Sequence, residues 1–154
     1  MGSSPVTKLD QALIGITRLG FDTSPIIYFI ETHPQYDGLV TEIFQRVSNG
    51  LFEGITSVIT LTEVLIHPLR RGDATLQQQY SDLLINAANF QTLPIDIKTA
   101  TSAADLRARY NLRTPDALQV ATALDASCDA FLTNDAALQR VTELRVLVLD
   151  QLEL

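Results

Sequence analysis

Short apolar runs alternate with longer amphipathic stretches from about residue 16 to the end of the chain. The short runs are rich in β-branched and large apolar side chains and are bounded by Gly, Asp or Asn, a pattern typical of buried strands. They predict five strands: one that ends at Asp22, and others at residues 54–60, 93–97, 130–133 and 145–149. Because these runs are apolar on both faces, we expect helices to cover both sides of the sheet.

The amphipathic stretches predict helices, and several carry end signals. Ser24 offers an N-cap and Pro25 a preset first turn for a helix through residue 30. Thr60 and Glu63 have the spacing of a capping box that opens a helix, which Pro68 should end. Further helices are expected at residues 36–49, 73–90, 98–110 and 114–126, with a short one after residue 135.

Strands that alternate with helices indicate an α/β fold, a three-layer α/β/α sandwich around a mostly parallel five-stranded sheet. No internal repeat, low-complexity linker or charge block divides the chain, so we expect a single domain over residues 1–154, with residues 1–15 as a flexible leader. The first four residues, MGSS, are compatible with a native start or with a vector-derived addition.

The composition is that of a globular protein without a membrane segment. Of the 154 residues, 46% are hydrophobic and 19% are charged. The longest unbroken apolar run covers residues 26–30, whereas a membrane-spanning helix needs about 20 residues. The single cysteine, Cys128, cannot form an internal disulfide and suits a reducing compartment. We therefore expect a cytoplasmic protein.

The charge balance limits how the protein could bind nucleic acid. Eighteen Asp and Glu against 11 Lys and Arg give a formal net charge of −7. Such a surface argues against nucleic-acid binding through bulk electrostatic attraction. A phosphate partner must instead be held by a local basic patch or by metal ions.

Four acids are expected at one edge of the sheet. The carboxyl ends of parallel strands meet at one edge, and ligands bind there where the strand order reverses. Asp22 and Asp135 directly follow predicted strands, and Glu63 lies in the first turn after another. Asp116 begins the helix that leads into the fourth strand, so it returns to the same edge. We expect the four carboxylates to surround one crevice.

Each acid alone also has a structural explanation. Glu63 and Asp116 suit the unpaired N–H groups of a helix start, Asp135 could cap a helix, and Asp22 could anchor a turn. Together, however, like charges ~4 Å apart repel by about 4 kcal/mol at an effective dielectric constant of 20. A divalent cation would turn this repulsion into ligation. Oxygen ligands favour Mg²⁺ or Mn²⁺, and one cysteine with two histidines disfavours zinc.

Four segments carry these acids in a recognisable order: residues 21–24 (FDTS), 60–64 (TLTEV), 113–123 (RTPDALQVATA) and 131–135 (FLTND). Together they resemble the acid-bearing motifs of the PIN-domain nucleases, and the resemblance extends from Phe21 to Asp150. It implies a three-layer fold, a divalent-metal site and hydrolysis of phosphodiester bonds, most often in RNA. Among bacterial members the chain is similar to the VapC-like toxins, which implies a cognate antitoxin partner and a homodimer.

The resemblance also implies roles for particular residues. Asp22, Glu63, Asp116 and Asp135 would be the catalytic and metal-binding acids, and Thr133 would support the site through hydrogen bonds. Thr23 and Ser24 would support it beside Asp22. The chain departs from the family pattern at Ser24 and Pro25, where many bacterial members have Asn after the Asp-Thr pair. It also has Ala136 and Ala137 where a further acid is common, which bears on a second metal.

Several basic residues could take part. Arg113 lies just before the Asp116 motif and could contact phosphate, as could Arg70 and Arg71, although exposed arginines usually only solvate a face. His67 follows Glu63 by four residues and could bind a metal, or could serve as a cation at a helix C-terminus.

Two other classes of protein compete with a metal-dependent ribonuclease. One is a catalytically silent module of the same fold that binds RNA or protein. The other is a phosphoacceptor receiver domain, which needs paired acids after the first strand and a Lys after the last. Here Phe21 precedes a single Asp22, and Asp150 follows the final strand.

Overall fold

The computed structural model describes residues 5–154, so the two interpretations of the first four residues lie outside it. The chain differs from the expected flexible leader from Thr7 onward. Strand β1 (Thr7–Lys8) pairs in parallel with strand β7 (Leu152–Glu153), and helix α1 (Leu9–Ala12) follows. Leu9 is only 1% exposed, because α1 packs its apolar side against the main core.

The main sheet has the five parallel strands that the sequence predicts. Among residues 5–154 it consists of β4-β3-β2-β5-β6 in spatial order, and every neighbouring pair is parallel. The strands are β2 (Arg18–Phe21), β3 (Glu53–Ser57), β4 (Phe90–Leu93), β5 (Ala130–Thr133) and β6 (Arg145–Val148). The α/β class and the parallel sheet are therefore confirmed.

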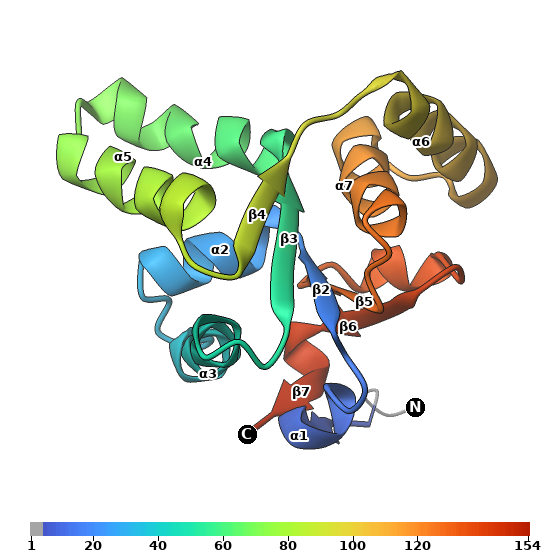
Figure 1. Cartoon of the computed structure of the whole chain (residues 1–154), viewed down its shortest axis with the longest axis horizontal. Helices are drawn as coiled ribbons and strands as arrows, with labels where there is room; N and C mark the ends of the chain where they lie inside the picture. The colour runs from blue at the N-terminus through green and yellow to red at the C-terminus, as the bar shows by residue number, and fades with distance from the viewer. Residues whose placement is uncertain (1–4) are drawn as a thin grey trace.

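Helices cover both faces of this sheet, which makes three layers (Figure 1). One face packs against α2 (Thr23–Ile30), α3 (Asp37–Ser48), α4 (Val58–Arg71), α5 (Ala74–Ser81) and the π-helical turn η1 (Asp82–Asn86). The other face packs against α6 (Ile97–Tyr110), α7 (Thr114–Asp125) and the 3₁₀ helix η2 (Ala136–Arg140). A second 3₁₀ helix, η3 (Leu149–Gln151), leads into β7. No helix of the described residues is long and apolar enough to span a membrane.

The strand order reverses between β2 and β5. The chain passes from β2 to β3 and β4 on one side of the sheet, and then returns to place β5 on the other side of β2. Phe21 lies opposite Leu132, and the Asp22 backbone N–H donates to the Leu132 carbonyl at 2.9 Å. Ligand sites of open parallel sheets lie at such a reversal, outside the carboxyl ends of the strands. The ends of β2 and β5 therefore locate the crevice where the site is expected.

The prediction for the start and end of α4 was wrong. The helix begins at Val58 and not at Thr60, because the Ser57 hydroxyl accepts from the Ile59 backbone N–H at 3.1 Å and caps it. Thr60 lies inside the helix and is fully buried, so it caps nothing. Pro68 also lies inside α4, where it packs on the buried side of the helix, and the helix ends only at Gly72 in the left-handed conformation.

Three other predicted boundaries were also wrong. The third predicted strand, at residues 93–97, is instead β4, three residues earlier. The helix expected to reach Phe90 ends at Asn86, because the Phe90 ring packs on Phe21 and Phe44, with ring centroids 5.4 and 5.9 Å away. The N-cap of α2 is Asp22 rather than Ser24, so the first candidate acid itself begins the helix.

Candidate functional site

Asp22 lies directly after β2 and caps α2. Its Oδ1 accepts from the Thr23 backbone N–H at 2.9 Å, and its Oδ2 accepts from the Thr133 hydroxyl at 2.7 Å. The residue is only 9% exposed. Burial raises the pKa of this carboxyl, the two hydrogen bonds oppose the shift, and the charges of Asp116 and Glu63 add to it. The ionised form of Asp22 is therefore energetically disfavoured at the reversal point of the sheet.

Thr133 connects the ends of the two strands at the reversal point. It is the last residue of β5 and is fully buried. Its hydroxyl donates to Asp22 and accepts from the Asp135 backbone N–H at 3.1 Å. The hydroxyl therefore holds the Asp22 carboxylate and shapes the turn that carries Asp135.

Asp116 lies in the first turn of α7 and is paired with an arginine. Its carboxylate is 8% exposed and accepts from Arg113 Nε at 3.1 Å and from Arg113 Nη2 at 3.4 Å. This pairing raises the pKa of Arg113, and the charges of Glu63 and Asp135 contribute smaller increases. The arginine that the sequence suggested for phosphate contact thus lies among the candidate acids, where it neutralises one of them.

Glu63 reaches across to the neighbouring helix. It lies inside α4, and its Oε1 accepts from the Thr23 hydroxyl at 2.6 Å. The capping-box role suggested for Glu63 was wrong, because the acid binds a residue of α2 and not the start of its own helix. Thr23 therefore links the element that begins at Asp22 to the helix that carries Glu63, and Ser24 is half-buried beside it in the first turn of α2.

Asp135 lies two residues after the end of β5. It caps η2 through a 3.0 Å hydrogen bond from the Ala137 backbone N–H to its Oδ1, and it is exposed. The capping explanation considered for this acid is thus realised in the structure. Its position after β5 leaves the acid at the same edge as the other three.

The donor set suits a hard cation by its chemistry. All four acids offer oxygen, the ligand atom that Mg²⁺ and Mn²⁺ prefer, and two of them are shielded from water. Each carboxylate is engaged by protein donors, and within residues 5–154 no group of three or more His, Cys, Asp or Glu stands at metal-binding spacing. Coordination by this set therefore requires side chains such as Asp116 to turn from their present partners.

The sequence analysis missed Gln119. This residue of α7 is 3% exposed, and its side-chain amide contacts the hydroxyls of Ser57, Thr60 and Thr23. A signal was present, because Gln119 interrupts a run of small and apolar residues on the buried side of α7, three positions after Asp116. The amide connects α7 with three other segments next to the acids.

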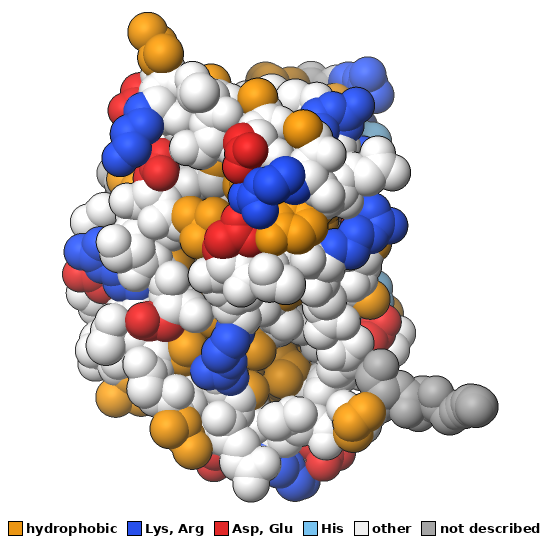
Figure 2. Space-filling model, turned by 90° about the vertical axis from the view of Figure 1, so that its right-hand side faces the viewer, with side chains coloured by type: hydrophobic (Ala, Val, Ile, Leu, Met, Phe, Trp, Pro, Cys, Tyr) orange, Lys and Arg blue, Asp and Glu red, His pale blue; other side chains and the backbone are white. Residues whose placement is uncertain are grey.

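The remaining basic candidates lie elsewhere. Arg70 and Arg71 are exposed in the last turn of α4, and His67 is exposed one turn after Glu63. Figure 2 shows one face of the molecule, on which acidic and basic side chains are interspersed. That pattern agrees with the expectation that broad electrostatic attraction does not bind nucleic acid.

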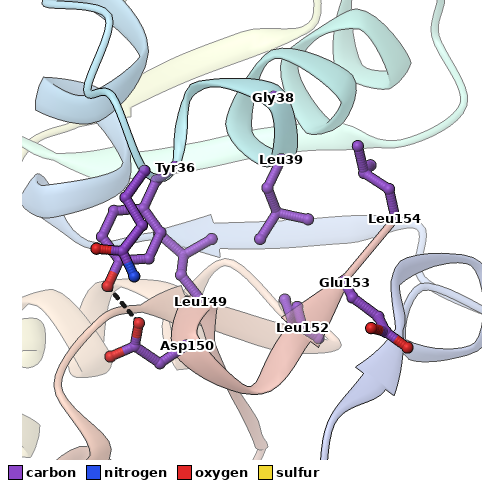
Figure 3. Close-up of a pocket in the computed structure, with 9 residues that line it drawn as sticks. Tyr36, Gly38, Leu39, Leu149, Asp150, Leu152, Glu153 and Leu154 are labelled. Atoms are coloured by element: carbon purple, nitrogen blue, oxygen red, sulfur yellow. Dashed lines mark hydrogen bonds between the residues drawn. The ribbon is translucent and has the colours of Figure 1, made fainter.

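A cavity of about 330 Å³ lies between the start of α3 and the C-terminal segment that contains η3 and β7 (Figure 3). Asp150 accepts a hydrogen bond from the Tyr36 hydroxyl in its wall, and leucines from α3, η3 and the C-terminal segment complete it. The Asp150 backbone N–H donates to the Asn134 side chain at 3.2 Å, and Asn134 directly precedes Asp135. The cavity thus adjoins the candidate site through the end of β5.

The arrangement of acids on this fold can now be compared with known proteins. The family model of the PIN domain matches residues 21–144, which contain all four acids. The chain belongs to the PIN domain family. Membership confirms the resemblance seen in the sequence and excludes the receiver-domain interpretation.

Solved structures similar to this fold include chains of toxin–antitoxin complexes. The PIN domain is similar to a chain of VapBC2 from Rickettsia felis, bound to a DNA fragment from their promoter, with a TM-score of 0.67 and 16% identity over 84% of this chain and 97% of that one. It is also similar to a chain of a toxin–antitoxin complex from Klebsiella pneumoniae, with a TM-score of 0.59 and 21% identity over 84% and 99% of the two chains. VapBC-5 from Mycobacterium tuberculosis gives a TM-score of 0.54 and 23% identity over 84% and 98%. No curated protein sequence matches the chain.

Proposed function

We propose that this PIN domain is a metal-dependent endoribonuclease that hydrolyses RNA phosphodiester bonds. The observation that carries the proposal is the buried Asp22 carboxylate, whose pKa is raised by burial and by the charges of Asp116 and Glu63 at the reversal point of the sheet. Uncompensated negative charge at a ligand-binding edge favours a cation partner. Membership of the PIN domain family supports the same conclusion.

Mg²⁺ or Mn²⁺ would be held by Asp22, Asp116 and Asp135, with Glu63 binding directly or through water. Such an ion lowers the pKa of bound water and stabilises the extra charge that develops on the phosphate in the transition state. Hydrogen bonds from the Thr23 backbone N–H and the Thr133 hydroxyl hold the two Asp22 carboxylate oxygens in place. None of these roles requires a covalent nucleophile. The resemblance to the PIN-domain nucleases implies products with 5′-phosphate and 3′-hydroxyl ends.

Arg113 has a second role in this proposal. Its side chain is 76% exposed while its guanidinium binds the buried Asp116 carboxylate. If Asp116 held the cation, the exposed Arg113 guanidinium would be free to bind a phosphate of the RNA. Arg70 and Arg71 would contact RNA farther along α4, in its last turn.

The biological setting is proposed from the structural neighbours. Those neighbours are parts of toxin–antitoxin complexes; one is bound to a DNA fragment from its promoter, and another is bound to DNA. We infer that this chain is the toxin of such a pair, acts in the cytoplasm as a homodimer and is held inactive by a cognate antitoxin. Co-expression with the protein encoded by the adjacent reading frame should yield a stable complex and relieve growth arrest.

The direct test is cleavage of single-stranded and structured RNA by the wild type and by Asp116→Asn. The wild type should cut with Mg²⁺ or Mn²⁺ and not with EDTA, and Asp116→Asn should reduce cutting to background. Asp82→Asn, which removes one exposed acid from η1, is the matched control and should cut at the wild-type rate. Equal rates for the wild type and Asp116→Asn would remove the acids from the mechanism.

A catalytically silent module is the second candidate. Two observations favour it: Asp116 is already paired with Arg113, and the described residues contain no group of three or more His, Cys, Asp or Glu that could hold a metal ion. RNA affinity and Mn²⁺ uptake without turnover, in a preparation freed of any bound partner, would select this candidate over the nuclease.

A further inference from the structure

We propose that Gln119 is a positioning residue that, through Thr23, holds Glu63 in place at the acidic site. The inference rests on the proposed function, because it concerns how the acids of that site are held. The Gln119 side-chain amide is buried and forms no hydrogen bond with any of the four carboxylates. The argument depends on the direction of each hydrogen bond in a chain from β3 to α4.

The chain of hydrogen bonds begins at Ser57, the last residue of β3. Its hydroxyl accepts from the Ile59 backbone N–H at 3.1 Å and lies 2.5 Å from Gln119 Oε1. A carbonyl oxygen can only accept, so Ser57 donates to Gln119. This bond orients the amide, and its nitrogen must face the opposite way.

The amide nitrogen then donates to two threonines. Gln119 Nε2 lies 2.7 Å from the Thr60 hydroxyl and 3.1 Å from the Thr23 hydroxyl, so both of its hydrogens are used. Both hydroxyl oxygens therefore act as acceptors toward Gln119. Because Ser57, Thr60 and Gln119 are all buried, water does not compete for these bonds.

The chain ends at Glu63. An ionised carboxylate only accepts, so the 2.6 Å contact is a hydrogen bond that Thr23 donates to Glu63. Thr23 also lies 3.3 Å from Thr60, but its one hydrogen is committed to the carboxylate. The path Ser57 to Gln119 to Thr23 to Glu63 thus runs in one direction.

These hydrogen bonds restrict the conformations of the Glu63 side chain. The Glu63 side chain is exposed, and a free glutamate loses rotamer entropy when it is fixed at a site. Gln119 donates to the hydroxyl oxygen of Thr23, the residue that binds Glu63. Gln119 also lies one turn after Asp116 in α7. Groups that orient metal ligands from behind typically change metal affinity by about 10–100-fold when they are removed.

The test is a double-mutant cycle measured by Mn²⁺ titration calorimetry. Gln119→Leu should weaken Mn²⁺ binding by about 10-fold or more in the wild-type background. In the Glu63→Gln background the same change should weaken it less than about two-fold, because the residue on which Gln119 acts is already neutral. The matched control is Thr122→Val, since Thr122 is a buried residue of the same helix whose hydroxyl bonds only Leu118 O at 2.9 Å; this variant should bind as the wild type does.

Each result of this cycle either supports or overturns the positioning role of Gln119. Equal losses in both backgrounds, or no loss in either, would overturn the positioning role, and a wild type that binds no Mn²⁺ would overturn both this role and the metal site. If the cycle behaves as expected while RNA remains uncut, the positioning role stands and the nuclease function falls. If melting in EDTA shows that Gln119→Leu is unfolded, Thr23→Val removes the half-buried hydroxyl that accepts from Gln119 and donates to Glu63, and the cycle is decided by the same criteria.

Discussion

The Arg113 guanidinium donates to both carboxylate oxygens of Asp116, through Nε at 3.1 Å and Nη2 at 3.4 Å. The two residues are three positions apart at the start of α7, a spacing that places them on the same side of the helix. The arginine is largely exposed while the acid is buried, so the pair can open toward solvent without disturbing the core. The Arg113 guanidinium thus already binds the Asp116 carboxylate that the proposed metal site needs.

Replacement of Arg113 should therefore strengthen metal binding. Arg113→Ala frees Asp116 from a competing cation, and an exposed ion pair is worth about 0.2–1 kcal/mol. We expect the Kd for Mn²⁺, measured by calorimetry, to fall by up to about five-fold, while RNA affinity becomes less dependent on salt. Arg70→Ala removes the same charge from the far end of α4 and should leave the Kd unchanged. A weaker Mn²⁺ affinity in Arg113→Ala would show that the arginine organises the site and does not compete for it.

Asp22→Asn should stabilise the protein in EDTA. Burial raises the pKa of Asp22, so the folded state binds a proton more readily than the unfolded state does. The stability that comes from that proton is present at low pH and is lost as the pH rises through the folded-state pKa. The gain in Tm from Asp22→Asn should therefore be larger at pH 7 than at pH 4. A relief of about 1 kcal/mol corresponds to about 2–4 °C in a chain of this size.

The same variant tests the metal site by calorimetric or fluorescence melting. Millimolar Mn²⁺ should raise the Tm of the wild type by mass action and should leave that of Asp22→Asn unchanged. Asp82→Asn controls for the loss of one negative charge and should keep the Mn²⁺ response. An unshifted wild-type Tm would contradict a metal site formed by these acids.

The sheet was predictable because its strands are short apolar runs buried on both faces. Residues 130–133 form β5 as expected, and 145–148 form β6. The boundaries of α4 were not predictable from caps alone, because two signals of equal local strength compete there. Ser57 caps the helix, whereas Thr60 is buried against Thr56 and Gln119, a tertiary contact that no local pattern reveals.

The edge on which the acids lie followed from topology, but their partners did not. Any helix that returns to a parallel sheet brings its first turn to the same edge, which is why Asp116 could be placed there. The hydrogen bond from Thr133 to Asp22 joins residues 111 positions apart and depends on two side-chain rotamers. Periodicity carries no information about such rotamers. Gln119 was visible as a polar residue on the buried side of α7, but its three hydroxyl partners could not be predicted.

Gly54→Ala should destabilise the fold at the β3–β4 pair. A Cβ at Gly54 would lie 2.5 Å from Phe90 Cδ2 and 3.1 Å from Phe21 Cε1, both of them in buried rings. Overpacking of this kind costs about 1–3 kcal/mol, so the midpoint of urea unfolding should fall. Gly38→Ala is the matched control, because its Cβ would meet nothing closer than Leu154 Cδ1 at 3.9 Å, and alanine favours the helix by about 0.5–1 kcal/mol. A similar midpoint for Gly54→Ala and the wild type would mean that the Phe90 ring yields easily.

Asp129 should contribute stability that disappears in acid. Its Oδ2 accepts from the backbone N–H of Thr17 at 2.7 Å and of Arg18 at 3.0 Å, and these bonds lower the pKa of the carboxyl. A depressed folded-state pKa means that the contribution is complete above about pH 4 and is lost as the pH falls through the folded-state value. Asp129→Ala should therefore lower Tm by about 2–4 °C at pH 7, or about 1 kcal/mol with allowance for solvent exposure, and by less at pH 3. Asp82→Ala removes an exposed acid that contacts only the Gln78 side chain, and a pH-independent difference between the two variants would contradict the role of Asp129.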